Sequence, residues 1–271
     1  MALRVGVAGA TGWTGRAVAE GILASEDLTL AAAVARKPAG QDLGKVFGRE
    51  PIGLAVDGTV EAALGRKLDV LVDYTHPTAV KAHALAAIER GVAVIVGTSG
   101  LTAADYAELD RAARAKGVGV IGSGNFSITA NLLQHFAEIA ARYVPDWEVF
   151  DYAKATKPDV PSGTAQQLAE RLGEIGRPKS ATPIDRTIGP KEARGADIAG
   201  TRVHSIRLPS YIIACEAQFG APDERLTIRH DAGSGAQPYV AGTLLAVRKV
   251  RGIKGVIRGL DRLMFGTPTS A

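Results

Sequence analysis

Short apolar runs alternate with segments of helical spacing along the first 120 residues of the chain. The apolar runs, each of which predicts a buried strand, span residues 3–8, 28–35, 69–73, 92–96 and 118–121. The segments with helical spacing lie between them, at residues 14–24, 60–64, 77–90 and 103–116. Strands that alternate with helices predict right-handed βαβ units and a parallel sheet. Because these strands are largely apolar, we expect helices on both faces of that sheet.

The pattern changes after residue 125. A long amphipathic helix is predicted at 127–143, a strand at 147–153 and a helix at 162–175. Residues 176–200 are polar and contain several prolines and glycines, which predicts a loop. Three runs of alternating polarity then predict strands at 201–208, 212–219 and 224–229, and helical patterns return at 238–249 and 254–264.

These patterns predict an α/β protein with two domains. The first is a Rossmann-type domain with a parallel sheet, formed by residues 1–125 and 236–271. The second is an α+β domain with a mixed or antiparallel sheet, formed by residues 126–235. We expect the C-terminal helices to pack back onto the first domain.

The cysteine count, the length of the apolar runs and the net charge limit the classes of protein to which this chain can belong. Cys215 is the single cysteine and no apolar run reaches the length of a membrane span, so we expect a cytoplasmic protein without disulfides or membrane contact. The net charge of +4 comes from scattered lysines and arginines, which argues against nucleic-acid binding and favours small anionic ligands. No group of His, Cys, Asp and Glu has metal-ligand spacing, so no metal is expected.

A glycine-rich loop follows the first predicted strand and precedes the first helix. Gly9 permits a tight turn, Gly12 lets a pyrophosphate approach the backbone, and Gly15 lets the helix pack close to the strand. The helix N-terminus offers N–H groups and a partial positive charge to phosphates. We therefore assign the loop to a dinucleotide cofactor. The other loop residues assigned to the cofactor are Thr11, Trp13 and Thr14.

The loop after the second predicted strand sets the choice of cofactor. An acidic residue there binds the adenosine ribose of NAD, but this chain has Arg36 and Lys37. Two cations suit a 2′-phosphate, so we predict NADPH, with NADH as a possible substitute. The alternative is that both cations belong to a solvated loop. Further along the sheet, the loops with Thr75 and His76, and with Gly97, Thr98 and Ser99, follow strand ends and are assigned to the ribose and nicotinamide.

A second candidate site lies in the stretch from Lys157 to Thr164. Pro158 and Pro161 force a non-helical path, after which Ser162 is suited to cap the next helix. The backbone N–H groups of Gly163 and Thr164, with the hydroxyls of Ser162 and Thr164, predict a pocket for a carboxylate. Lys157 would either bind the anionic substrate or deliver a proton. The alternative is an ordinary helix cap beside a solvated lysine.

Together these segments resemble the dihydrodipicolinate reductase family of lysine and diaminopimelate biosynthesis. The resemblance covers nearly the whole chain and rests on the glycine loop, DVLVDYTHP (69–77), VGTSG (96–100), GNFS (124–127), KPDVPSGTA (157–165), RG (194–195), HSIRLP (204–209) and LTIRH (226–230). It implies hydride transfer from NAD(P)H to an unsaturated nitrogen heterocycle that carries carboxylates, and a role for Asn125 and Phe126 in cofactor binding. It also implies a homo-oligomer, a tetramer or a dimer, built through the sheet of the second domain.

The chain departs from the family pattern at the expected acid. The family carries two adjacent histidines shortly before the lysine, where this chain has Ala153 and Lys154, and an arginine after the last strand, where residues 231–237 hold none. Trp13 stands where an arginine is common. We therefore consider Lys157, Lys154, Tyr152 and water as proton donors.

Three hypotheses about function remain open. The first is a reductase of this type acting on the C=N or C=C bond of a small, carboxylated, cyclic imine. The second is an amine dehydrogenase or imine reductase for substrates without two carboxylates, which the missing arginine favours. The third is a non-catalytic NADPH-binding sensor, which the missing histidines favour and the retained Lys157 opposes.

Overall fold

The chain folds into two compact units, Met1–Ile128 with Ala236–Ala271 (unit 1) and Thr129–Gly235 (unit 2). The structure is a computed structural model, and it describes residues 2–179 and 182–266. Residues 180–181 of the predicted loop and residues 267–271 of the expected first domain lie outside the described residues.

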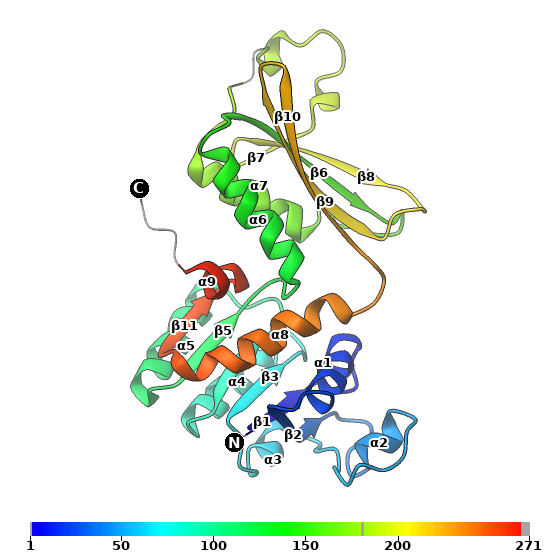
Figure 1. Cartoon of the computed structure of the whole chain (residues 1–271), viewed down its shortest axis with the longest axis vertical. Coiled ribbons are helices and arrows are strands. Elements are labelled where there is room, and N and C mark those ends of the chain that lie inside the picture. The colour runs from blue at the N-terminus through cyan, green and yellow to red at the C-terminus, as the bar shows by residue number, and fades with distance from the viewer. Residues whose placement is uncertain (1, 180–181, 267–271) are drawn as a thin grey trace. The chain divides into compact units, whose positions relative to one another are not determined.

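Unit 1 is built on a six-stranded sheet in which every neighbouring pair is parallel (Figure 1). In sheet order its strands are β2 (Leu28–Val34), β1 (Leu3–Ala8), β3 (Val70–Asp73), β4 (Ala93–Val96), β5 (Gly119–Gly122) and β11 (Gly255–Arg258). The chain runs outward in opposite directions from β1 and β3. The loops after these two strands therefore meet at the switch point, where ligands bind in open parallel sheets.

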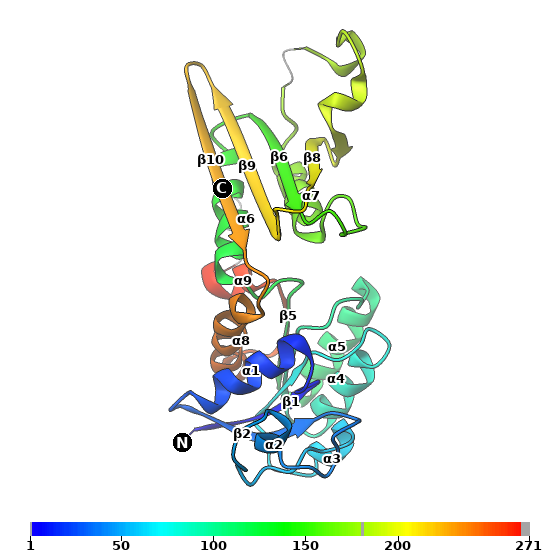
Figure 2. The ribbon, with the colours of Figure 1, turned by 90° about the vertical axis from the view of Figure 1, so that its right-hand side faces the viewer.

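Helices cover both faces of this sheet (Figure 2). They are α1 (Trp13–Leu23), α2 (Leu43–Val46), α3 (Val60–Ala63), α4 (Val80–Glu89), α5 (Ala103–Lys116), α8 (Gln237–Lys249) and α9 (Leu260–Phe265). Buried residues of α1, α8 and α9 share one apolar core with the sheet, and buried residues of α3, α4 and α5 share the other. The expected covering of both faces is confirmed, and α8 shares the core on the α1 side of the sheet.

The segment 254–264 is a correction to the predicted helices. It forms β11 followed by α9 rather than one helix. Gly255 and Gly259 have φ angles of +93° and +101°, which no helix accommodates, and they bracket the β-branched pair Val256 and Ile257. This pair extends the sheet beside β5.

Unit 2 contains a mixed five-stranded sheet. In sheet order its strands are β10 (Glu224–Ala232), β9 (Ile213–Ala221), β6 (Asp146–Ala153), β8 (Thr201–Arg207) and β7 (Ala196–Ile198). Only β6 and β8 pair in parallel. Helices α6 (Ile128–Ala141) and α7 (Gly163–Ile175) pack on one face through a core that includes Leu133, Leu168, Val149 and Phe219.

The predicted loop at 176–200 is more structured than expected. It contains β7 and two short 3₁₀ turns, Ile184–Arg186 and Lys191–Arg194. The short strand has no alternating apolar pattern of its own, and its register comes from antiparallel pairing with β8. With this exception the predicted class, a Rossmann-type parallel sheet plus a second α+β domain, is confirmed. None of the helices within residues 2–179 and 182–266 has the length and apolar character needed to cross a membrane.

Candidate active site

The glycine loop joins β1 to α1 and has the close packing that glycine permits. Gly9 has a φ of +81°, and a Cβ on it would overlap the backbone carbonyl of Tyr74. A Cβ on Gly15 would overlap the carbonyl oxygen of Gly9. At Gly12 a Cβ would meet only the Gly9 carbonyl oxygen, at 3.2 Å, and would otherwise project into open space. Gly9 and Gly15 are therefore required by the packing of the loop itself, whereas Gly12 leaves space beside the loop.

The N-terminus of α1 suits a pyrophosphate. Gly12 is the N-cap residue, and it has no side chain to accept from the first turn. The backbone N–H groups of Trp13, Thr14 and Gly15 have no acceptor within the described part of the chain. Unsatisfied N–H groups at the start of an eleven-residue helix form a site for an anion. The residues present therefore fit the diphosphate of a dinucleotide.

A cavity of about 730 Å³ opens beside this loop. It is lined by residues of the glycine loop, of the end of β2, of the segment that enters α3, and of the β3–α4 connection, including Gly9, Thr11, Gly12, Arg36, Glu61, Thr75, His76 and His83. Arg36 belongs to the wall of this cavity, whereas Lys37 does not. Both side chains are exposed and lack an ion-pair partner among the described residues. The sequence pattern predicts a pair of cations in one site, but of the two only Arg36 lines the cavity.

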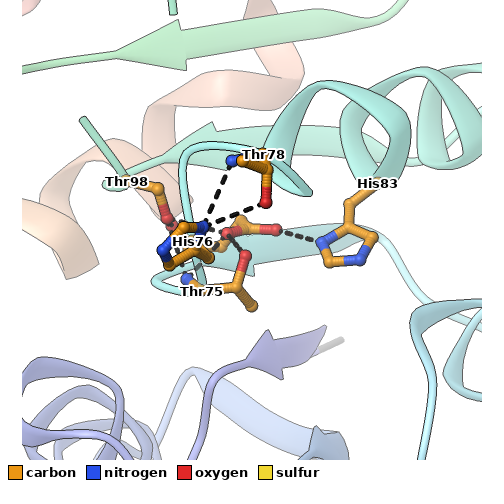
Figure 3. Close-up of polar contacts among 6 residues, drawn as sticks. Thr75, His76, Thr78, His83 and Thr98 are labelled. Atoms are coloured by element: carbon orange, nitrogen blue, oxygen red, sulfur yellow. Dashed lines mark hydrogen bonds and ion pairs between the residues drawn. The ribbon is translucent and has the colours of Figure 1, made fainter. Parts of the chain in front are cut away.

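Asp73, at the end of β3, joins the loops that follow β3 and β4, whose residues Thr75 and Thr98 are labelled in Figure 3. Its side chain is fully buried. The backbone N–H and the hydroxyl of Thr75 donate to Asp73 Oδ1 at 2.9 and 2.6 Å, and the Thr98 hydroxyl donates to the same oxygen at 2.9 Å. The Thr75 N–H also lies 2.8 Å from Thr98 Oγ1. One carboxylate thus holds the loops that follow β3 and β4 next to each other.

The remaining predicted cofactor residues lie at the same edge of the sheet. His76 is exposed, and its Nδ1 lies 3.0 Å from the Thr78 hydroxyl. Gly97, Thr98 and Ser99 directly follow β4. Asn125 and Phe126 follow β5, where Asn125 Oδ1 accepts from the Ser127 N–H and Phe126 is buried against Tyr74.

In unit 2, the loop that carries Lys157 is anchored by a buried ion pair. Asp151 in β6 is fully buried, and Arg207 at the end of β8 donates to its Oδ2 at 2.7 Å. The same guanidinium nitrogen donates to the carbonyl oxygen of Asp159, and the backbone N–H of Ser162 donates to Asp151 Oδ2 at 2.9 Å. Asp151 and Arg207 therefore fix both the middle and the end of the loop.

Ser162 occupies the N-cap position of α7, but its side chain does not cap the helix. This corrects the predicted capping role, and the reason is that Asp151 accepts the Ser162 N–H and turns the residue inward. The buried Ser162 Oγ has no hydrogen-bond partner among the described residues, and neither do Asp151 Oδ1 and Arg207 Nε. The backbone N–H of Gly163 also lacks an acceptor in the described chain. Buried polar atoms of this kind are normally paired. We call the group formed by Ser162 Oγ, Asp151 Oδ1, Arg207 Nε and the Gly163 N–H the cradle, and it is open to a polar ligand or water.

Lys157 lies beside this cradle and forms an ion pair with Asp159. Its Nζ is 2.7 Å from Asp159 Oδ1, and the lysine holds the pKa of that carboxyl below its usual range. The Lys157 side chain is a quarter exposed, whereas Lys154 is an exposed residue with no ion-pair partner among the described residues. A cation with one exposed carboxylate partner can exchange that partner for a substrate carboxylate.

Tyr152 lies on the other face of the unit 2 sheet. Successive side chains of a strand point to opposite faces, so Tyr152 faces away from α7 while Asp151 faces toward it. The Tyr152 hydroxyl is 3.5 Å from Glu216 Oε2, and the guanidinium of Arg229 lies 4.5 Å from the centre of its ring. Burial raises the pKa of the Tyr152 hydroxyl, and the nearby Glu216 carboxylate raises it further. The structure does not bring Tyr152 together with Lys157 and Ser162.

Four side chains of these sites were missed by the sequence reasoning: Asp73, His83, Asp151 and Arg207. Asp73 ends an otherwise apolar strand, and Asp151 is a fully buried carboxylate of β6; each stands shortly before a predicted ligand loop. An ionisable residue in such a position could have been recognised, whereas its partners are distant in sequence and could not.

Comparisons with known proteins agree with this geometry. The family model described as "Dihydrodipicolinate reductase, N-terminus" matches residues 3–126, and "Dihydrodipicolinate reductase, C-terminus" matches residues 129–264. The chain belongs to the dihydrodipicolinate reductase family. A 4-hydroxy-tetrahydrodipicolinate reductase of Moorella thermoacetica is 38% identical over 264 residues, which cover 97% of this chain and 98% of that protein.

Solved structures support the same assignment. A dipicolinate-bound dihydrodipicolinate reductase from Paenisporosarcina sp. TG-14 superposes with a TM-score of 0.87 at 29% identity, and the match covers 97% of this chain and 100% of that one. An amine dehydrogenase from Mycobacterium smegmatis superposes with a TM-score of 0.66 at 18% identity, and the match covers 96% of this chain and 95% of that one. This likeness shows a shared fold. The protein is thus an NAD(P)H-dependent oxidoreductase of the dihydrodipicolinate reductase type, as the resemblance implied.

Proposed function

We propose that this enzyme uses NADPH to reduce the C=N or C=C bond of a small cyclic imine that carries carboxylates, with 4-hydroxy-tetrahydrodipicolinate as the first substrate to test. The observation that carries the proposal is the cradle in unit 2. The buried Ser162 Oγ, the free N–H of Gly163 and the Lys157 ammonium are all groups that bind a carboxylate. They occur in a chain whose other unit has the site for a dinucleotide.

The residues of unit 2 have separate roles in this proposal. Ser162, Gly163 and Thr164 bind one carboxylate of the substrate at the start of α7. Asp151 and Arg207 act as positioning residues, because they hold the loop from which these groups project. Lys157 leaves Asp159 to bind substrate, since a substrate carboxylate can take the place of that exposed partner.

Lys157 is also the proton donor that we retain. The bound cofactor supplies a hydride to carbon, and the reduced bond then requires one proton on its other atom. The Lys157 ammonium can donate this proton from Nζ and regain it from solvent, because a quarter of its side chain is exposed. Lys154 is the second candidate. Tyr152 is not retained, since it faces away from the cradle and its pKa is raised.

The preference for NADPH rests on Arg36. Arg36 belongs to the wall of the cofactor cavity, and it has no ion-pair partner among the described residues. The carboxylate of Glu61 lines the same cavity and would favour the ribose hydroxyls of NADH instead. We propose that Arg36 decides the choice, because it lies two residues after the end of β2, where the adenosine ribose is bound in sheets of this order.

We further propose a homo-oligomer, a tetramer or a dimer, built through the face of the unit 2 sheet that α6 and α7 leave uncovered. This face carries Phe150 and Tyr152 beside charged groups such as Glu216 and Arg229. Light scattering during gel filtration would test it, and a monomer at micromolar concentration would contradict it.

The deciding experiment for the activity is NADPH oxidation, followed by absorbance, with dihydrodipicolinate generated in place. Parallel reactions contain cyclic imines with one carboxylate, and ketones with ammonia. Turnover that is fastest with the dicarboxylate supports the proposal. Faster turnover of ketones with ammonia would indicate an amine dehydrogenase, and tight NADPH binding without turnover of any compound would indicate a sensor.

A further inference from the structure

His83 lies in the wall of the cofactor cavity, outside every sequence motif described above. It stands on α4, one turn from the start of the helix, and Figure 3 shows its ring pointing toward the end of β3. Its Nδ1 is 2.8 Å from Asp73 Oδ2, and a fifth of its side chain is exposed. The residue is therefore fixed on one side and open on the other.

The partner of His83 determines where its ring protons are. The other oxygen of Asp73 accepts three hydrogen bonds from Thr75 and Thr98, so the carboxyl group is placed as an acceptor. In this arrangement His83 donates to Asp73 from Nδ1. The hydrogen bond to Asp73 raises the pKa of His83, and the carboxylate of Glu61 adds to this effect, whereas burial opposes it.

The second ring nitrogen of His83 is available to a ligand. Nε2 lies on the opposite side of the imidazole from Nδ1, and it has no hydrogen-bond partner within the described chain. Because Asp73 fixes Nδ1 and the ring plane, Nε2 is held in one direction. A histidine oriented by a carboxylate through one nitrogen commonly uses the other nitrogen for function.

The surroundings of His83 identify which part of the cofactor it would meet. In sheets of this order the diphosphate binds at the start of α1, and the adenosine ribose binds at the end of β2. The wall around His83 includes Arg36, which follows β2, and Glu61, which is close enough to influence the charge of His83. His83 thus belongs to the adenosine half of the cavity. The charged or titratable groups of this wall are Arg36, Glu61, Tyr74, His76 and His83 itself, and Asp73 contacts His83 from the end of β3.

We propose that His83 is an adenosine-binding residue of the cofactor site, whose protonated imidazole donates from Nε2–H to the adenine ring or its ribose. This inference rests on cofactor binding at the glycine loop. It assigns Asp73 two tasks, since the same carboxylate holds the Thr75 and Thr98 loops and keeps the imidazole charged and oriented.

The test compares two variants of His83 in the full chain. In His83→Asn the amide nitrogen can replace Nδ1 and keep the bond to Asp73, but nothing replaces Nε2. In His83→Ala both nitrogens are lost. Affinities for ADP-ribose and for nicotinamide mononucleotide are measured by calorimetry at pH 6, and circular dichroism confirms that each variant is folded. His135→Asn, the same change on α6 in unit 2, is the control.

We expect His83→Asn to weaken ADP-ribose binding about tenfold, which is typical for the loss of a hydrogen bond from a charged donor. Binding of nicotinamide mononucleotide, which lacks adenosine, should not change. If His83→Asn binds ADP-ribose like the unmodified chain and only His83→Ala is impaired, then His83 acts only through Asp73, and the proposal is wrong.

The pH dependence of ADP-ribose affinity in the unmodified chain is a second measurement, and it does not depend on whether a variant folds. ADP-ribose is suitable because it has no 2′-phosphate that titrates near neutral pH. Its affinity should be highest while His83 is protonated and should fall as the pH rises through the raised pKa of His83. A flat profile between pH 6 and 9, or one that persists in His83→Asn, overturns the proposal. If the unmodified chain binds no dinucleotide at all, cofactor binding itself fails, which is a distinguishable result.

Discussion

Lys157 is the residue on which the proposed chemistry depends most. Replacing it by alanine removes both a carboxylate partner and a proton donor, so we expect kcat/KM with the dicarboxylate substrate to fall about 100-fold. Lys157→Arg keeps the charge but cannot readily release a proton, and it should restore KM more than kcat. Steady-state NADPH oxidation separates these effects.

The control for Lys157 is Lys116→Ala, at the exposed C-terminal end of α5 in unit 1. This variant should leave both kcat and KM unchanged. Turnover of dihydrodipicolinate that survives Lys157→Ala would refute the role given to this lysine. In that case Lys154→Ala is the next variant to measure.

Arg36 and Lys37 allow a prediction about cofactor choice in which the two cations differ. Arg36→Gln should weaken the binding of NADPH by about 10-fold to 100-fold and change the binding of NADH little. The reason is that the variant loses its contact with the 2′-phosphate, which only NADPH carries. Lys37→Gln should have a smaller effect, since only Arg36 lines the cavity. Fluorescence titration with both cofactors measures this. Equal losses for NADPH and NADH in Arg36→Gln would contradict the assignment.

Single residues were predictable from the sequence where a local pattern dictates them. Gly9 and Gly15 follow from the geometry of a strand, a turn and a helix, all within a few positions. The pairs Asp73–His83 and Asp151–Arg207 join residues whose proximity depends on the fold, and no local spacing indicates them. The predicted cap by Ser162 failed for the same reason, since Asp151 lies on a different element.

The connection from β1 to α1 gives a prediction that separates binding from folding. Gly12 has a φ of −73°, which alanine can adopt, and the added Cβ would meet only one atom, the carbonyl oxygen of Gly9. That Cβ would, however, project into the space that we propose for the pyrophosphate. We expect Gly12→Ala to keep its thermal unfolding midpoint while NADPH affinity falls about tenfold or more, as a steric clash of this size costs about 1–3 kcal/mol.

Gly252→Ala is the matched control for Gly12, because a Cβ at Gly252 meets nothing within 4 Å. It should preserve both stability and affinity. Unchanged NADPH binding in Gly12→Ala would mean that the diphosphate is not bound at this loop.

Elements were predictable where hydrophobic periodicity is long and regular. The strands that are buried on both faces and the helices α1, α5 and α7 follow from such patterns. The segment 254–264 did not, because a four-residue strand followed by a short helix contains the same apolar residues as one helix. Only its glycines with positive φ, Gly255 and Gly259, distinguish the two, and a sequence does not state a φ.

Each unit has its own apolar core and its own candidate site, and this division predicts where ligands protect the chain. Backbone amides that contact a bound ligand exchange more slowly, and a ligand at 100 times its Kd stabilises the bound form by about 2.7 kcal/mol. In hydrogen exchange followed by mass spectrometry, ADP-ribose should protect residues 9–15 and 73–76 of unit 1. Pyridine-2,6-dicarboxylate should protect residues 157–165 of unit 2.

Two variants make this prediction decisive, because each should weaken one protection and leave the other. At the same ligand concentration, Gly12→Ala should reduce protection by ADP-ribose, because its affinity is lower, while the dicarboxylate still protects residues 157–165. Lys157→Ala should do the reverse, since Lys157 supplies the cation of the cradle while the glycine loop of unit 1 is unchanged. Protection of the 157–165 segment by ADP-ribose alone, or loss of both protections in either variant, would show that the assignment of cofactor to unit 1 and substrate carboxylate to unit 2 is wrong.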